Sequence, residues 1–428
     1  MRETPQNPKV LILGGGYAGM MAAARVARET RQAEITLIDQ NPVFVQRIRL
    51  HEILAGRRPA TLEYAPLLAK RGLRFLQARV ESLDLAARRV AVREPNGARR
   101  QIPYDSLILA LGSTTAAGVP GVAEHTVRLD VPATLGQTHE RLRQLASTGG
   151  RVVVAGGGLT GIETATEVAE RFPALRVTLA TRGKLGDGYS PTGAAHLRQR
   201  FTALGIELRE DVDITAVQAG RIEISHESGG DESGGDESGG TSPGELPFDL
   251  CLWCGGFVAP PLARQAGLPV DGVGRVLTDA AQRAPGHPEV FVAGDAAAPW
   301  SDGPFAIRMS CASALPGGAQ AGENVARFLR GEEPLPYSMA FGLRCISLGR
   351  KEALVQFVTG DDRPLPKIWT GRRAVWVKEL ICRMTLFVVR WEVRSSWRLY
   401  PWSRPIPRLV DSPGAPEKKV AAASRAVG

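Results

Sequence analysis

The chain has 428 residues, of which 43% are hydrophobic and 23% are charged, and its formal net charge is +9. This length exceeds the size at which one hydrophobic core continues to grow, so two or three domains are expected in a folded globular protein. No run of about 18 uncharged apolar residues is present to span a bilayer. The first residues, MRETPQNPKVLILGGG, lack the basic and apolar regions of a secretion signal, so a cytoplasmic protein is expected.

The first element is a glycine-rich turn between an expected strand, Val10 to Leu13, and a helix that opens at Met20. The spacing Gly14-x-Gly16-x-x-Gly19 allows a tight turn, the approach of a pyrophosphate and close packing of the helix on the strand. Asp39 ends the next apolar run, ITLID, where a carboxylate is placed to accept hydrogen bonds from a ribose diol. The combination predicts a dinucleotide site rather than a turn without a ligand.

A second unit of the same kind begins with RVVVAGGGLTGIETATEVAERF, in which Gly156, Gly158 and Gly161 form the turn. Its next strand, VTLATR, carries Thr181 in place of the acidic residue, and Arg182 follows. Arginine and threonine suit a 2′-phosphate better than a bare diol, so the second site is expected to prefer NADPH to NADH.

The five cysteines are scattered, which argues against a disulfide framework. Cys251 and Cys254 alone have redox spacing, and their strand-like surroundings favour buried structural thiols over a redox pair. Residues 226–245 repeat ESGGD without apolar side chains and are expected to form a flexible insertion. Residues 412–428 are expected to be a disordered tail.

Two further segments, YDSLILALGSTT at 104–115 and VFVAGDAAA at 290–298, read as strands that end in Gly112 and in Gly294-Asp295. With the two glycine turns, and in this order, the chain resembles the two-dinucleotide-binding-domain FAD oxidoreductases that use pyridine nucleotides. The resemblance runs from Val10 to about Arg330. It implies an α/β fold with two Rossmann-like domains, in which residues 1–115 and 257–331 bind FAD and residues 116–256 bind NAD(P)H. A C-terminal α+β region with an amphipathic helix is expected over 332–411.

Within this family, GGGLTGIETATEV and ALPGGAQAGENVAR are similar to segments of the type II NADH dehydrogenases. The resemblance implies that Glu163 handles protons near the flavin and nicotinamide, and that Gln320 acts beside the flavin and quinone. The alternatives are an exposed carboxylate that favours the helix dipole, and a helix-surface amide. The segment FVQRIRLHEILAG departs from the family in being cationic. There Arg47 or Arg49 could stabilise a reduced anionic flavin, bind a phosphate or form a surface ion pair.

Two sets of cofactor-binding residues follow, and no metal site is expected. The FAD set comprises Gly14, Gly16, Tyr17, Ala18, Gly19, Asp39, Gln40, Arg47, Val80, Ala110, Leu111, Gly112, Gly294, Asp295 and Ala319. The nicotinamide-nucleotide set comprises Gly156, Gly158, Thr160, Gly161, Thr181, Arg182 and Gly256.

The C-terminal part is basic, with 13 Lys or Arg against 4 Asp or Glu over residues 364–428. Apolar residues at helical spacing there predict an amphipathic helix. They are Trp376, Val377, Leu380, Ile381, Met384, Phe387, Val388 and Trp391. The apolar face either packs on the body or lies on a membrane surface, as in the type II dehydrogenases, on the inner face of the cell membrane. No nucleic-acid motif accompanies the basic residues, so nucleic-acid binding is not expected.

The expected function is that of an FAD-dependent NAD(P)H oxidoreductase that passes hydride from nicotinamide to flavin and electrons to a quinone or another small acceptor. The first 112 residues contain no cysteine, which excludes a disulfide relay there. Alternatives are a reductase of a redox protein or biosynthetic intermediate, and a flavin redox sensor or scaffold similar to apoptosis-inducing factor. A homodimer is compatible with all three.

Overall fold

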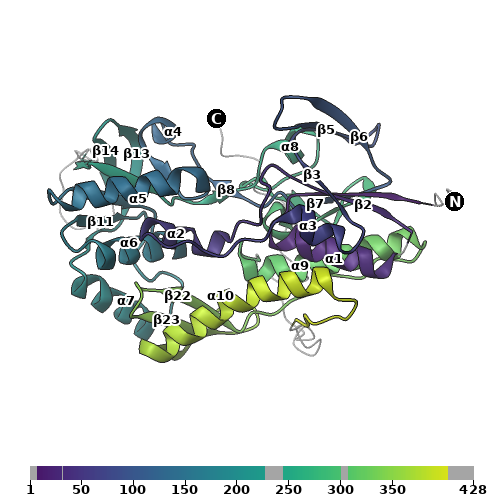
Figure 1. Cartoon of the computed structure of the whole chain (residues 1–428). Helices are drawn as coiled ribbons and strands as arrows, with labels where there is room; N and C mark the ends of the chain where they lie inside the picture. Colours follow the sequence, from purple (N-terminus) through teal and green to yellow (C-terminus); the bar gives the residue numbers. More distant parts are fainter. Residues whose placement is uncertain (1–6, 31, 227–243, 300–306, 403–428) are drawn as a thin grey trace, which may run out of the picture.

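The computed structural model of the protein describes residues 7–30, 32–226, 244–299 and 307–402. It has two lobes side by side, each with a parallel sheet, and a C-terminal region that runs beneath both (Figure 1). The expected flexible insertion falls mostly on residues 227–243, and the expected tail falls on 412–428. Both lie outside the described residues.

The first sheet has six strands in the order β19-β20-β7-β1-β2-β3. Their bounds are Arg283–Ala284 (β19), His287–Val292 (β20), Ser106–Leu109 (β7), Lys9–Leu13 (β1), Glu34–Asp39 (β2) and Arg74–Gln77 (β3). All neighbours pair in parallel except β19, which is antiparallel to β20. The carboxyl ends of the parallel strands therefore share one edge, where the first glycine turn opens.

Both faces of the first sheet are covered. The helices α1 (Tyr17–Glu29) and α9 (Cys311–Leu329) pack on one face, and the antiparallel sheet of β4 (Arg79–Asp84), β5 (Arg89–Arg93) and β6 (Arg99–Pro103) packs on the other. Glycines let α1 and α9 approach closely, because a Cβ on Gly318 would lie 2.1 Å from the Ala18 carbonyl oxygen. Alternate residues of β1 accordingly enter two different cores, as expected for a strand buried on both faces.

The second sheet has five parallel strands in the order β12-β11-β10-β16-β9. Their bounds are Glu207–Arg209 (β12), Arg176–Ala180 (β11), Arg151–Ala155 (β10), Leu250–Trp253 (β16) and Val127–Arg128 (β9). One face packs on α5 (Pro132–Ala146), α6 (Leu159–Arg171) and α7 (Pro191–Ala203). The other packs on the antiparallel sheet of β13 (Val212–Gln218), β14 (Arg221–His226) and β15 (Gly244–Pro247). The two lobes thus repeat one three-layer plan.

Shorter elements join and flank the two lobes. The antiparallel pair β8 (Thr114–Thr115) and β17 (Phe257–Val258) carries the chain to the second lobe and back. The others are η1 (Arg47–Arg49), α2 (Leu50–Leu54), α3 (Tyr64–Ala69), α4 (Val122–His125), α8 (Leu262–Gln265), β18 (Val276–Leu277), η2 (Gly294–Ala296) and β21 (Ala297–Ala298).

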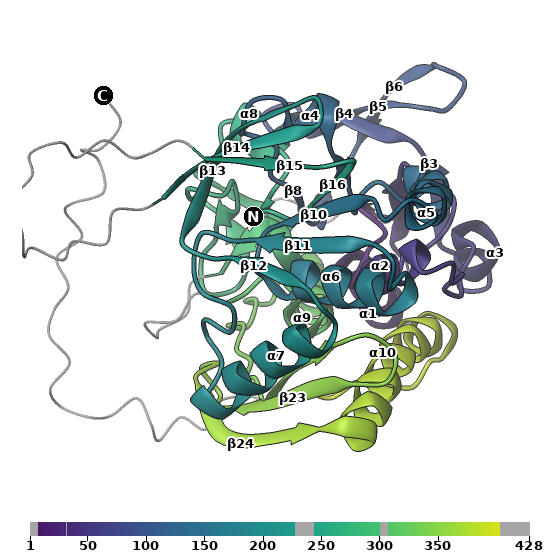
Figure 2. The same ribbon diagram turned by 90° about the vertical axis from the view of Figure 1, so that its left-hand side faces the viewer.

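The C-terminal region consists of an antiparallel sheet and one long helix. The sheet comprises β22 (Leu343–Ser347), β23 (Ala353–Val358) and β24 (Pro364–Thr370), and the helix is α10 (Gly371–Arg394). Figure 2 shows β23, β24 and α10 along the lower edge of the molecule, below α7. α10 packs on this sheet and on α1 and α3. Buried Arg25 of α1 anchors it through Glu392 of α10, at 3.2 Å, and Glu323 of α9, at 2.9 Å.

The α/β fold with two Rossmann-like units is confirmed. The C-terminal region combines strands with one helix, as the expected α+β region does. Most of the predicted apolar face of α10 is exposed rather than packed on the body. Val388 is buried, whereas five of the eight residues are exposed: Trp376, Leu380, Met384, Phe387 and Trp391. In the described part of the chain, the helices are too short or too polar to cross a membrane.

Candidate active site

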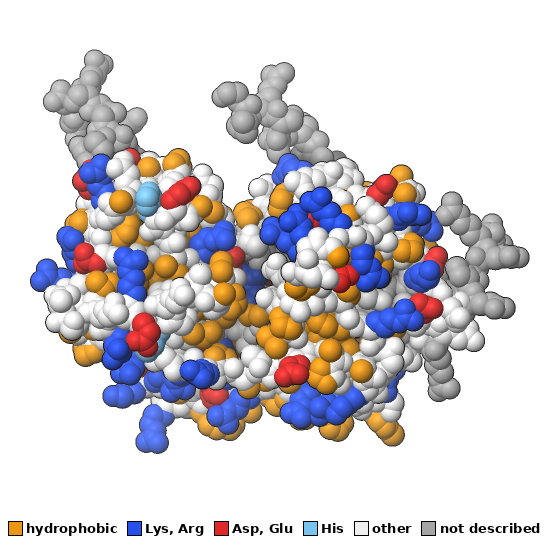
Figure 3. Space-filling model, turned by 45° about the horizontal axis from the view of Figure 1, so that its top comes forward, with side chains coloured by type: hydrophobic (Ala, Val, Ile, Leu, Met, Phe, Trp, Pro, Cys, Tyr) orange, Lys and Arg blue, Asp and Glu red, His pale blue; other side chains and the backbone are white. Residues whose placement is uncertain are grey.

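A cavity of about 1290 Å³ is lined by residues of both lobes and of α10. Figure 3 shows the hollow between the two lobes. Fifteen of the expected site residues line it, from both glycine turns, the strand ends and α6. They are Gly16, Tyr17, Ala18, Arg47, Ala110, Gly112, Gly156, Gly158, Thr160, Glu163, Thr181, Arg182, Gly256, Gly294 and Asp295. Residues far apart in the sequence thus converge on one continuous space that is large enough for two extended ligands.

The first glycine turn offers the cavity an open backbone. A Cβ on Gly16 would meet no protein atom within 4 Å, whereas a Cβ on Gly19 would lie 1.8 Å from the Gly14 carbonyl oxygen. Gly16 therefore leaves room for a ligand, while Gly14 and Gly19 allow close packing behind it. Asp39 ends β2 beside the turn, and its Oδ2 accepts a hydrogen bond of 2.7 Å from the backbone N–H of Gly15.

Asp295 in η2 supplies the clearest sign that the first site can hold a ligand. Its Oδ2 accepts a hydrogen bond of 2.7 Å from Ser113 Oγ. Its Oδ1 is buried without a hydrogen-bond partner among the described residues. A buried carboxylate oxygen requires a donor, and the hydroxyl groups of a bound FAD would provide one. The residues therefore fit this cofactor.

Arg47 belongs to the cationic segment that departs from the family pattern. It lines the cavity, donates a hydrogen bond to the Ser113 carbonyl oxygen and lies 5.8 Å from the ring centroid of Phe257. Arg49, by contrast, is paired with Glu52 and with Glu379 of α10, each at 2.8 Å. Of these two arginines, Arg47 faces the cavity, while Arg49 helps to hold α10.

The second glycine turn repeats the construction of the first. A Cβ on Gly158 would meet nothing within 4 Å, and one on Gly161 would lie 1.8 Å from the Gly156 carbonyl oxygen. Thr181 and Arg182 follow β11 and line the same end of the cavity. This end is therefore open to a second dinucleotide.

Glu163, just after the first turn of α6, is buried and paired with a lysine that was not among the expected site residues. Its Oε1 lies 2.8 Å from Lys378 Nζ of α10 and accepts hydrogen bonds of 3.1 Å from the backbone N–H and the hydroxyl of Ser347. Burial alone would raise the pKa of Glu163. Its charged and polar neighbours, chiefly the Lys378 ammonium, outweigh burial and lower the pKa to about 2. The expected alternative of an exposed carboxylate is wrong.

Lys378 is the positive half of this pair, and it also lines the cavity. Burial would lower its pKa, but the Glu163 carboxylate outweighs burial and raises the pKa well above its usual value. Both groups are therefore charged at neutral pH. The sequence carried one signal for this lysine, a lone cation within the apolar run AVWVKELIC.

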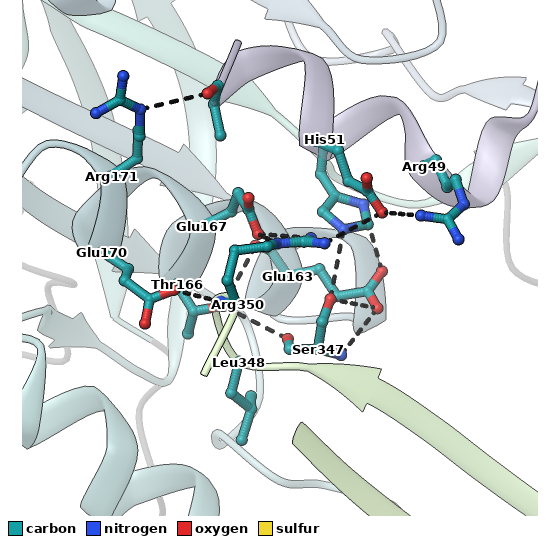
Figure 4. A network of polar contacts seen from close by, with 12 residues as sticks. Arg49, His51, Glu163, Thr166, Glu167, Glu170, Arg171, Ser347, Leu348 and Arg350 are labelled. Carbon is teal, nitrogen blue, oxygen red and sulfur yellow. Dashed lines mark hydrogen bonds and ion pairs between the residues drawn. The ribbon is translucent and has the colours of Figure 1, made fainter. Parts of the chain in front are cut away.

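His51 of α2 completes the cluster, as Figure 4 shows. Its Nδ1 lies 3.7 Å from Glu163 Oε2, and its Nε2 lies 3.4 Å from Ser347 Oγ. Burial, only partly opposed by Glu163, lowers the pKa of His51. The imidazole is therefore neutral at pH 7, and Lys378 is the cation that balances Glu163.

Behind the cluster a second set of ion pairs joins α6, α2 and the C-terminal sheet. Arg350 contacts Glu167 at 2.7 Å and Glu52 at 3.4 Å (Figure 4). Because Glu52 also binds Arg49, the chain of contacts reaches α10 through Glu379. These pairs hold α6 and α10 in place on both sides of Glu163.

Several expected site residues do not reach the cavity wall. Gln320 and Ala319 are buried within α9, and the Gln320 amide donates a hydrogen bond of 3.1 Å to Asn324 Oδ1. Gln320 therefore belongs to the packing around α9 and is neither at the cavity nor a surface amide. Gly14, Gly19 and Gly161 pack internally. Asp39 ends β2, and Gln40 after it is exposed. Val80 and Leu111 contact a hydrophobic core.

The described cysteines are all free. Cys251 and Cys254 are buried, and burial raises the pKa of Cys254 to about 12. These thiols are protonated at neutral pH, which agrees with a structural role. Cys311, Cys345 and Cys382, from α9, β22 and α10, line the cavity near Lys378. Burial also raises the pKa of Cys311, to about 12.

Comparison with known proteins agrees with this geometry. The demethylphylloquinone reductase of Synechocystis sp. is 28% identical over 308 residues, which span 69% of this chain and 73% of that protein. A type II NADH:quinone oxidoreductase of Staphylococcus aureus is 24% identical over 416 residues, which span 89% of this chain and 96% of that protein.

Among solved structures, the sulfide:quinone oxidoreductase of Aquifex aeolicus matches with a TM-score of 0.75 at 20% identity, covering 90% of this chain and 91% of that one. The family model described as pyridine nucleotide-disulphide oxidoreductase matches residues 8–322. This range contains both glycine turns, Glu163 and Asp295. The chain therefore belongs to the pyridine nucleotide-disulphide oxidoreductase family.

Proposed function

We propose that this protein is an FAD-dependent NAD(P)H:quinone oxidoreductase. The observation that carries the proposal is the single cavity that joins both glycine turns, Asp295 and the Glu163–Lys378 pair. In the proposed assignment, residues 1–115 and 257–331 bind FAD and residues 116–256 bind the nicotinamide nucleotide. When bound, FAD would accept hydride from the nicotinamide and pass two electrons to the quinone.

The protein's own contribution to the first half-reaction is positioning. The glycine turns let the two dinucleotides approach the backbone, and Asp295 Oδ1 offers an acceptor to the FAD chain. Arg47 brings a positive charge to the cavity wall, where it favours a negatively charged reduced flavin.

Reduction of a quinone to a quinol also needs protons, and Lys378 is placed to hold one at the cavity wall. Its ammonium lies 2.8 Å from Glu163 and is kept charged by that carboxylate. Once Lys378 has given a proton to an acceptor, the ionised Glu163 favours its reprotonation. The pair is therefore proposed to serve the second half-reaction, from flavin to quinone.

The proposal is tested by reconstituting the protein with FAD and reducing it anaerobically with NADH or NADPH. The flavin absorbance should bleach, and a water-soluble quinone should restore it. A protein that takes up no FAD, or whose bound flavin neither nucleotide bleaches, would contradict the proposal.

Glu163→Gln separates the two half-reactions. It is expected to slow quinone-dependent reoxidation about tenfold or more, while flavin reduction by the nucleotide changes little. Glu167→Gln is the matched control, because Glu167 lies on the same helix, is also buried and paired, but does not line the cavity. Equal effects of the two substitutions would exclude a proton role for Glu163.

We also propose that α10 binds a membrane surface. Its exposed side carries an apolar stripe, which we define as Trp376, Leu380, Met384, Phe387 and Trp391, next to exposed arginines. Aromatic residues suit the interface and arginines suit anionic headgroups. Because α10 also lines the cavity, through Lys378, Ile381 and Cys382, this location would place the cavity one helix away from the membrane surface.

Flotation with anionic phospholipid vesicles tests the proposal. The double substitution of Trp376 and Phe387 by serine should abolish co-flotation, whereas Leu277→Ser, which changes an exposed leucine of β18, should not. Soluble dimers that the same double substitution dissociates would instead show that a second copy covers the stripe.

A further inference from the structure

The two strands that end beside the glycine turns, β2 and β11, place different side chains at the same position. In the first lobe the Gly14 N–H donates a hydrogen bond of 2.8 Å to the Ile38 carbonyl oxygen, and in the second the Gly156 N–H donates one of 2.7 Å to that of Ala180. The residues that follow these carbonyls, Asp39 and Thr181, are therefore structural equivalents.

The side chains at this position recognise different partners. Asp39 is a carboxylate beside its turn, held by the N–H of Gly15 at 2.7 Å, and a carboxylate here accepts hydrogen bonds from a ribose diol. Thr181 is equally close to its own turn, since a Cβ on Gly157 would lie 2.2 Å from Thr181 Oγ1. Thr181 carries no charge. It therefore binds a ribose diol less strongly than a carboxylate such as Asp39 would, and it does not repel a phosphate.

Arg182 adds a positive charge next to Thr181. Its side chain is 77% exposed and lines the nucleotide end of the cavity. Its acidic partner is Asp213, whose Oδ1 lies 3.9 Å from Arg182 Nε, and both side chains are exposed. Such a pair contributes little and is easily exchanged for a better one. The guanidinium is therefore free to bind an anion.

β12 is the neighbour of β11 in the sheet, and the acidic residue that follows it is already paired with an arginine. Glu210, after β12, accepts two hydrogen bonds from Arg198, at 2.7 and 2.9 Å. It also accepts one from the backbone N–H of Leu185. Its charge therefore offsets Arg198 rather than Arg182. Asp213 also lines the cavity here, and a 2′-phosphate would compete with this weak, exposed pair for the Arg182 guanidinium.

We propose that the nicotinamide nucleotide of this protein is NADPH, whose 2′-phosphate is bound by Arg182 and the Thr181 hydroxyl. The inference rests on the proposed function as an NAD(P)H oxidoreductase and names which of the two nucleotides it uses. A charge-assisted contact between guanidinium and phosphate is the kind of interaction that separates the two.

The test measures binding and flavin reduction separately in the FAD-loaded protein. Calorimetry should show NADP⁺ binding at least tenfold more tightly than NAD⁺. Arg182→Ala should weaken NADP⁺ about tenfold to a hundredfold, the effect of losing a hydrogen bond to a charged group, and leave NAD⁺ within about twofold. Thr181→Asp should reverse the preference, because its carboxylate repels the 2′-phosphate and accepts from the diol.

Arg176→Ala is the matched control, since Arg176 is exposed at the opposite end of β11. It should change neither affinity. Tighter binding of NAD⁺ by the natural chain, or an equal loss of both nucleotides in Arg182→Ala, would overturn the inference while flavin bleaching by NADH left the proposed function intact. If neither nucleotide binds or bleaches the flavin, both proposals fail.

Discussion

Replacing Lys378 with methionine tests the charge arrangement at the centre of the site. Methionine keeps the length and much of the volume of the lysine side chain but removes its charge. Glu163, which is 7% exposed, would then retain hydrogen bonds from Ser347 and lose its cation. Leaving one member of a buried pair without its partner is strongly destabilising.

The size of the effect follows from the pKa of Glu163. In the intact protein this pKa lies at about 2 instead of 4.5, which corresponds to about 3 kcal/mol at 1.36 kcal/mol per pKa unit. Because the folded-state pKa is depressed, this stabilisation is fully present above about pH 4.5 and is lost as pH falls through 2. Without Lys378, burial raises the pKa of Glu163, so the penalty should shrink as the group becomes protonated.

Urea unfolding followed by circular dichroism measures this difference at pH 7.5 and pH 5. Lys378→Met should lower the free energy of unfolding by about 3 kcal/mol at the higher pH and by less at the lower pH. Arg390→Met, an exposed site on the same helix, should stay within about 0.5 kcal/mol of the natural chain. A variant as stable as the control at both pH values would refute the proposed pairing.

Three further predictions concern other parts of the molecule. Gly158→Val should keep the thermal unfolding midpoint but lose nucleotide binding in calorimetry, because its side chain enters open cavity space. Gly161→Ala should instead lower the midpoint, since its Cβ would clash with a carbonyl oxygen, and equal midpoints for the two variants would contradict this reasoning. Glu392→Gln should cost about 2 kcal/mol in urea unfolding, because buried Arg25 loses one of its two acidic partners, and an unchanged midpoint would count against the anchor. Cys311, whose pKa burial raises to about 12, should be alkylated by iodoacetamide slowly at pH 7 and faster as pH rises, so rapid labelling of the native protein at pH 7 would be inconsistent with this raised pKa.

The nucleotide half of the site could be predicted from sequence because its signals are local. A strand, three glycines and a helix occur within about 20 residues, and the turn itself shapes the site. The structure accordingly brings Gly16, Gly158, Thr181 and Asp295 to one cavity.

The acceptor half could not be predicted in the same way. Lys378, His51 and Ser347 reach Glu163 from three distant segments, and helical periodicity carries no information about such contacts. Apolar periodicity likewise does not indicate which side of α10 packs on the body. That side carries Glu392 and Lys378, which are paired with Arg25 and Glu163 of the body.

Gln320 shows the limit of reasoning from a motif. The resemblance placed it at the flavin, but in this chain the α9 segment around it is built for packing. Gly318 and Gly322 let α9 press against α1, and Gln320 faces Asn324 within that packed layer. The first residues of α9, such as Cys311, reach the cavity instead.

The position of Lys378 also has a consequence for how the protein is made. Domains generally fold in order as the chain is synthesised, so both glycine turns and Glu163 are complete before α10 exists. Until then Glu163 lacks its counterion, and a nascent or truncated chain would hold nucleotide sites without the charged pair. The charged pair at the cavity wall is therefore assembled only when the fold is completed by α10.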